Sequence, residues 1–103
     1  MNPHIEIPHD RLAAFCDRWR ITELALFGSI LRADFGPDSD VDVLARFDEQ
    51  ARHTLFDLVH MEDELRTIFG REIDLVSRRA IETSRNPMRR KAILESAEVI
   101  HAT

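Results

Sequence analysis

The sequence has a single cysteine, no tyrosine and no long uninterrupted run of apolar residues in its 103 positions. One cysteine, Cys16, cannot form a disulfide bond within the chain. The lack of a long apolar run argues against a secretory signal peptide and against a membrane-spanning helix. Together these absences predict a protein of the reducing cytoplasm that has no association with a membrane.

Composition and charge argue against two further classes of protein. Hydrophobic residues make up 44% and charged residues 32% of the chain, which is typical of a folded globular domain and not of a disordered segment. A formal net charge of −5 argues against a general nucleic-acid coat, so we expect no direct binding of nucleic acid. The length fits one domain over residues 1–103, with no room for a separate recognition domain. The sequence leaves open whether this domain forms a homo-oligomer.

Helix-start and helix-end signals predict three helices. Asp10 can cap a first helix, and Thr54 with Asp57 resembles a capping box at the start of a longer one. Gly70 follows the last residue of that longer apolar pattern and predicts its end. Pro87 suits the first turn of a last helix that continues to about residue 96.

Strand formers occupy the segments between these helices. We expect strands over residues 21–27, 40–47 and 72–77, and an edge strand at Val99 and Ile100. The order of elements predicts an α/β (α+β) fold, in which helices pack against a small mixed β-sheet.

Two aspartates, Asp40 and Asp42, stand two positions apart at the start of the second expected strand. Alternate residues of a strand face the same side, so both carboxylates would lie together while Val41 and Val43 point into the core. Like charges held this close repel, and a divalent cation such as Mg²⁺ or Mn²⁺ would neutralise them. The alternative is a solvated loop that runs into an exposed strand.

A glycine and a serine, Gly28 and Ser29, follow the first expected strand and precede an expected helix start over residues 29–32. Free backbone N–H groups at a helix start favour phosphate, and glycine permits its close approach. The segment is not a P-loop, because no lysine follows the glycine. An ordinary strand-to-helix turn is the other interpretation.

These motifs together resemble a known signature. Gly28-Ser29, Arg32 and Ser39-Asp40-Val41-Asp42 are similar to the G-S-x-x-R and S-D-x-D motifs of the DNA polymerase beta-like nucleotidyltransferase superfamily. The short length resembles its MNT-type minimal nucleotidyltransferases, which are often antitoxins beside HEPN-domain ribonuclease toxins. The resemblance covers nearly the whole chain, because Asp74 stands where this family carries a third carboxylate on a later strand. Departures at Ile30 and Ala33 would change the shape of the nucleotide pocket and remove no charged group.

The resemblance implies a site with a role for each of these residues. Asp40 and Asp42 would bridge two Mg²⁺ ions, and Asp74 would complete the coordination of one of them. Gly28, Ser29, Arg32 and Ser39 would bind the nucleotide, chiefly through its phosphates. Taken alone, Asp74 could equally be a capped strand end that faces solvent, and Arg32 could instead form an ion pair with Asp34 or Asp38.

The implied activity is transfer of AMP from ATP to a hydroxyl group of a partner HEPN-type toxin. In this family the hydroxyl belongs characteristically to a tyrosine, and the absence of tyrosine here means that the partner must supply it. One alternative is the same chemistry on a small molecule, for which relatives usually carry an additional acceptor domain. The other is an antitoxin that neutralises its partner mainly by binding.

The charge balance reverses in residues 71–91, which contain seven basic and three acidic residues. The basic residues are Arg71, Arg78, Arg79, Arg85, Arg89, Arg90 and Lys91, against Glu72, Asp74 and Glu82. The stretch could be a solvated surface whose arginines pair loosely with acidic neighbours. It could also dock an acidic surface of the partner or help to bind triphosphate, because arginine matches carboxylate and phosphate groups.

Overall fold

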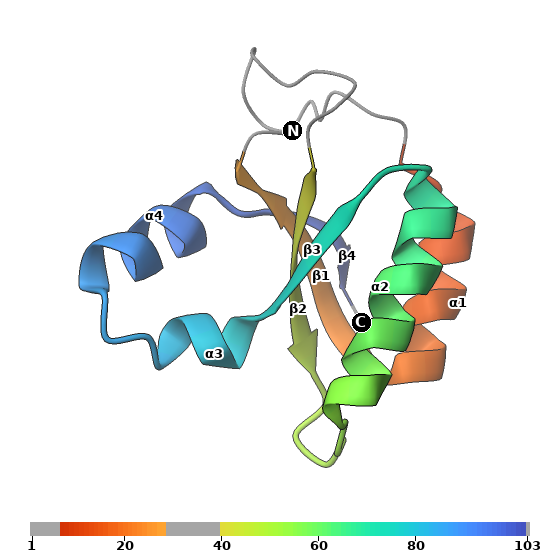
Figure 1. The fold of residues 1–103 in the computed structure, drawn as a ribbon, viewed down its shortest axis with the longest axis horizontal. Coiled ribbons are helices and arrows are strands. Elements are labelled where there is room, and N and C mark those ends of the chain that lie inside the picture. The colour runs from red at the N-terminus through yellow and green to blue at the C-terminus, as the bar shows by residue number, and fades with distance from the viewer. Residues whose placement is uncertain (1–6, 29–39, 103) are drawn as a thin grey trace.

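The computed structural model describes residues 7–28 and 40–102, and within them it contains one mixed β-sheet with helices on both faces (Figure 1). The expected helix start at residues 29–32 lies outside the described residues. The elements are α1 (His9–Trp19), β1 (Ile21–Phe27), β2 (Val41–Phe47), α2 (Leu55–Phe69), β3 (Ile73–Ser77), α3 (Arg78–Glu82), α4 (Pro87–Ser96) and β4 (Glu98–Ala102). The α+β fold expected from the sequence is therefore confirmed.

The strand order across the sheet is β3-β2-β1-β4. β1 pairs antiparallel with β2 on one side and with β4 on the other, whereas β2 and β3 are parallel. A parallel neighbour requires a crossover connection, and α2 provides it between β2 and β3. β4 lies at the edge of the sheet, as the sequence predicts for residues 99–100.

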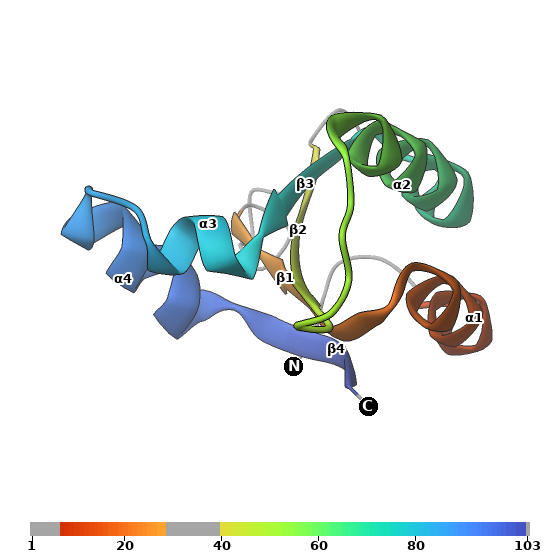
Figure 2. The ribbon, with the colours of Figure 1, turned by 90° about the horizontal axis from the view of Figure 1, so that it is seen from below.

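Each face of the sheet has its own apolar layer. Figure 2 shows the two pairs of helices that cover these faces. Helices α1 and α2 cover one face, where Leu12, Met61 and Leu65 pack against Val41 and Val43. Helices α3 and α4 cover the other face, and their packing residues are Ile81 and Ile93, which contact a cluster of Ala25, Phe27 and Leu44. The alternation of side chains along β2 sends Val41 and Val43 to the first face and Leu44 to the second.

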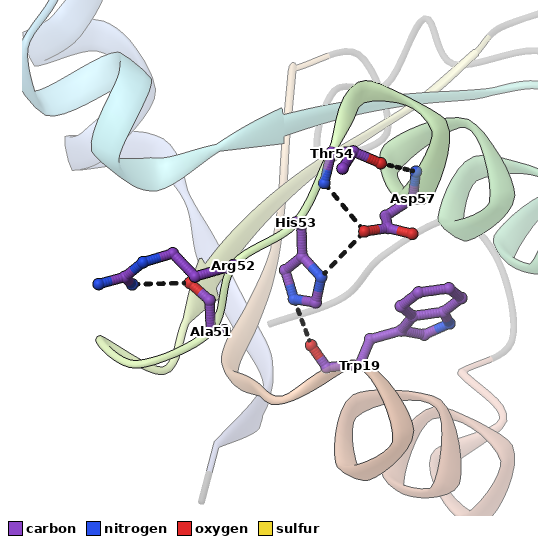
Figure 3. Close-up of polar contacts among 6 residues, drawn as sticks. All are labelled: Trp19, Ala51, Arg52, His53, Thr54 and Asp57. Carbon is purple, nitrogen blue, oxygen red and sulfur yellow. Dashed lines mark hydrogen bonds and ion pairs between the residues drawn. The ribbon is translucent and has the colours of Figure 1, made fainter.

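Helix α2 begins with a complete capping box, as predicted (Figure 3). The Asp57 backbone N–H donates to Thr54 Oγ1 at 3.2 Å, and the Thr54 backbone N–H donates to Asp57 Oδ2 at 2.9 Å. His53, immediately before the cap, bonds through Nε2 to the Trp19 carbonyl oxygen at 2.8 Å. The start of α2 is therefore held both by its own cap and by a link to the end of α1.

Thr54→Ala is expected to lower the free energy of unfolding by about 1 kcal/mol, because one N-terminal N–H of α2 loses its acceptor. Thermal unfolding followed by circular dichroism should show a lower midpoint. Thr67→Ala is the matched control, since Thr67 lies within α2 and its hydroxyl only donates to the Asp63 carbonyl. Equal midpoints for the two variants would show that the cap contributes nothing.

One local prediction is wrong, and one short helix was not predicted. Pro8, not Asp10, is the N-cap residue of α1, which begins at His9 without a side-chain cap bond; Asp10 lies in the first turn. Proline fixes its own backbone angle and can precede a helix, so the start does not depend on an acidic cap. The short helix α3 has no capping side chain and no long apolar repeat, and the sequence patterns did not predict it. None of the helices in the described part of the chain is long and apolar enough to cross a membrane.

Candidate active site

Two of the three predicted carboxylates are direct neighbours across the sheet. Asp42 on β2 and Asp74 on β3 are register partners in the parallel pair, although 31 residues separate them along the chain. Paired residues of adjacent strands point to the same face. Both carboxylates therefore lie on the face opposite α1 and α2, because Val41 and Val43 on either side of Asp42 are buried under those helices.

The surroundings of this pair explain how a carboxylate can stand within a strand. Leu44 and Val76, further along the same strands, are packed in the layer under α3 and α4. Asp42 is half-buried and Asp74 is exposed, so the pair lies at the open end of that layer. β2 and β3 both begin at the upper end of the sheet in Figure 1, and the pair is near this end. The fold thus places acidic groups where solvent or a ligand can reach them.

Gly28 directly contacts the same site. It follows β1 with a φ of 77°, in the left-handed region that favours glycine. A Cβ atom added to Gly28 would stand 3.2 Å from Asp42 Cγ and would overlap the nearer carboxylate oxygen. The absence of a side chain at Gly28 is therefore required for Asp42 to hold this position.

Phe27 is a site neighbour that the sequence reasoning missed. It is only 7% exposed, it pairs with Asp42 in the antiparallel register, and it belongs to the layer under α3 and α4. An apolar ring beside the carboxylate limits the access of water on that side. Its position immediately before the Gly28-Ser29 motif was the signal that could have identified it.

The third predicted carboxylate, Asp40, is exposed and immediately precedes β2. Among the described residues, no group of three or more His, Cys, Asp or Glu side chains is arranged to hold a metal ion. The predicted nucleotide-binding residues Ser29, Arg32 and Ser39 lie outside the described residues. The structure thus brings together Asp42, Asp74 and Gly28, and the assignment of metal and nucleotide ligands stays a prediction.

Other reactive groups lie away from this pair. Cys16 is fully buried, and burial raises the pKa of its thiol to about 11, so it is not a nucleophile at neutral pH. A hollow of about 620 Å³ lies beyond the far ends of the same strands, where its lining includes Phe47, His53 and Ser77. Its lining contains no residue of the carboxylate pair. The chemistry of the described residues therefore concentrates at Gly28, Asp42 and Asp74.

Comparisons with known proteins identify the family to which the chain belongs. The model of the nucleotidyltransferase domain family matches residues 11–100. The chain is 31% identical over 67 residues to the protein adenylyltransferase MntA of Thermococcus cleftensis, covering 65% of this chain and 66% of that protein. Among solved structures, a toxin–antitoxin complex with AMP-PNP matches with a TM-score of 0.70 and 14% identity, over 94% of this chain and 75% of that chain.

A second solved structure extends the comparison. It is a complex of a tri-AMPylated Shewanella oneidensis HEPN toxin with an MNT antitoxin, and it matches with a TM-score of 0.62 at 14% identity, over 92% of this chain and 70% of that chain. At this identity both structural matches establish the fold, and the family match over residues 11–100 establishes the relationship. The chain therefore belongs to the nucleotidyltransferase domain family and is an MNT-type minimal nucleotidyltransferase.

Proposed function

We propose that this enzyme transfers AMP from Mg²⁺-bound ATP to a tyrosine hydroxyl of a partner HEPN-type ribonuclease toxin and thereby acts as its antitoxin. The observation that carries the proposal is the pairing of Asp42 and Asp74 beside the side-chain-free Gly28. The similarity to the adenylyltransferase MntA supports the type of reaction. The similarity to a complex that contains an AMPylated HEPN toxin supports the class of partner.

The donor chemistry of the site fits Mg²⁺, because this ion prefers oxygen ligands and carboxylates supply them. Asp40, Asp42 and Asp74 would hold one or two ions. When bound, the metal neutralises phosphate charge and lowers the pKa of the acceptor hydroxyl. A cation also removes the repulsion between Asp42 and Asp74, which the fold places in register on adjacent strands.

The residues of the chain would then orient the reactants and move one proton. Backbone N–H groups at Gly28 and Ser29, with the side chains of Ser29, Arg32 and Ser39, would hold the triphosphate. The acceptor oxygen forms a bond to the α-phosphorus while the bond to the leaving pyrophosphate breaks. Asp74 suits the role of proton acceptor, because it is exposed and makes no side-chain hydrogen bond or ion pair with the described residues.

The chain contains no tyrosine, so a tyrosine acceptor has to belong to another molecule. The test is to incubate the chain with Mg²⁺, ATP and a candidate HEPN-domain partner, and then to measure intact masses. We expect one or more AMP adducts on tyrosine residues of the partner and none when Mg²⁺ is chelated. Parallel reactions with the other nucleoside triphosphates should give less product.

Two other results of the same experiment would contradict the proposal. Binding and inhibition of the HEPN protein without an adduct would indicate an antitoxin that acts by contact. Consumption of ATP only in the presence of an added small-molecule acceptor would indicate the same transfer chemistry on a different substrate.

A further inference from the structure

The connection between α3 and α4 forms a basic corner on the surface. We define this α3–α4 corner as residues 79–91, with the exposed side chains of Arg79, Arg85, Met88, Arg89 and Lys91. Helices α3 and α4 lie on the same face of the sheet as the carboxylate pair, as Figure 2 shows for the two helix layers. The corner is therefore on the side of the molecule from which an acceptor would approach the site.

Backbone and side-chain hydrogen bonds hold the turn of this corner. The Asn86 backbone N–H donates to Ser84 Oγ at 3.2 Å, and the Arg89 backbone N–H donates to Asn86 Oδ1 at 3.1 Å. Arg90 Nη1 donates to the Ser84 carbonyl oxygen at 3.1 Å, and Thr83 Oγ1 donates to the Arg79 carbonyl oxygen at 2.9 Å. A surface that is ordered before it meets a partner loses little conformational entropy on binding.

The cations of the corner are not compensated by neighbouring acids. Arg78, just before the corner, forms ion pairs with Glu23 at 2.9 Å and with Glu82 at 3.4 Å. Glu82 is the one acidic residue of the corner, and it is therefore already paired. By contrast, the side chains of four cations form no ion pair or hydrogen bond with the described residues: Arg79, Arg85, Arg89 and Lys91. Loose pairing with acidic neighbours therefore accounts for Arg78 and does not account for these four.

The position of Arg89 opposes the stability of its own helix. It is the third residue of α4, whose first turn contains no acidic residue. The positive end of the helix dipole disfavours a cation there and favours Glu or Asp. The charge of Arg89 thus does not stabilise α4, which points to a role in binding rather than in folding.

An apolar side chain stands among these cations. Met88 is 83% exposed, although a methionine of its size usually gains from burial. Arg85, in the connection before α4, and Arg89, the next residue of the helix, are both exposed. An adaptable apolar residue between two arginines is typical of a protein-binding surface, because methionine fits irregular contacts and arginine forms paired hydrogen bonds to carboxylates.

We infer that the α3–α4 corner docks an acidic segment of the acceptor protein and so helps to select which protein is modified. This inference rests on the proposed function, in which the acceptor of AMP is a protein. Met88 is the apolar contact, and Arg85 and Arg89 bind carboxylates of the segment. A bound triphosphate would explain the cations and would not explain the exposed apolar side chain of Met88 in the same corner.

The test measures binding and transfer separately. The variant carries Arg85→Glu and Arg89→Glu, and the matched control carries Arg11→Glu and Arg20→Glu, two exposed arginines on the side of the molecule that bears α1. The probe is the HEPN-domain protein, titrated at low and at high salt. We expect the dissociation constant of the corner variant to rise about tenfold at low salt and less at high salt. Met88→Ser should weaken binding by about threefold to tenfold at both salt concentrations.

The accompanying readouts separate a docking role from a structural one. The KM for the acceptor should rise in the corner variant, whereas the KM for ATP should stay unchanged. Its thermal midpoint should hold or increase, because glutamate suits the start of α4 better than arginine.

If the corner variant keeps both its affinity for the HEPN protein and its KM for the acceptor, the docking inference is wrong. AMP transfer by the wild type would still support the proposed function in that case. Weaker binding of ATP by the corner variant, measured without a partner, would overturn the docking inference in favour of a phosphate-binding role. If the wild type binds the HEPN protein without transfer, the proposed function fails and the binding data still decide the docking surface. If the wild type does not bind the HEPN protein at all, both the proposed function and the docking inference are wrong.

Discussion

The double substitution Asp40→Ala and Asp42→Ala is expected to reduce AMP transfer by roughly three orders of magnitude or more, because it removes ligands that position and neutralise the triphosphate. The domain should remain folded. Asp42 is a register partner of Asp74, so its removal also ends a like-charge repulsion in the metal-free protein. The increase in thermal midpoint that Mg²⁺ produces in the wild type should be lost in this variant.

A matched control shows whether this effect is specific. Glu49→Ala with Glu95→Ala removes two exposed carboxylates from other parts of the surface and changes the net charge equally. This control should keep nearly full activity and its response to Mg²⁺. Full activity in the Asp40 and Asp42 variant would show that the metal and catalytic site lies elsewhere.

Gly28→Ala is expected to reduce transfer by about a hundredfold, because the added Cβ must displace the Asp42 carboxylate and a misplaced catalytic group is costly. The left-handed backbone at Gly28 adds strain of about 1 kcal/mol, and the collision with Asp42 adds to it. Both the activity and the free energy of unfolding should therefore fall. Steady-state kinetics and thermal unfolding of the same preparations measure the two effects.

Gly70→Ala separates the contact from the backbone strain. Gly70 has a φ of 68°, close to that of Gly28, but an added Cβ would meet no atom within 4 Å. The two variants should lose similar stability from strain, and only Gly28→Ala should lose activity. Comparable activity losses in both variants would attribute the effect to general destabilisation and not to the position of Asp42.

Local patterns in the sequence were sufficient for most of the elements. Strand formers between Arg20 and Gly28 predicted β1 with the bounds that the structure shows, and the Thr54 and Asp57 pair predicted the start of α2. Such signals depend on residues within one turn or one strand, so they can be recognised without the rest of the chain. The errors were local too: α3 has only five residues and no side-chain cap bond, and α1 begins beyond Pro8 without an acidic cap.

The same distinction between local patterns and long-range packing applies to the candidate site. The alternation of Asp40 and Asp42 with apolar residues, and the glycine after the preceding strand, can be recognised in the sequence because they are properties of neighbouring positions. The three-dimensional arrangement was needed to show that β3 pairs in parallel with β2 and brings Asp74 beside Asp42, and that Gly28 must lack a side chain because Asp42 occupies the space. It also decided that α3 and α4 pack on the face of that pair. These facts depend on strand pairing and packing between distant segments, which the apolar faces of the whole chain determine together.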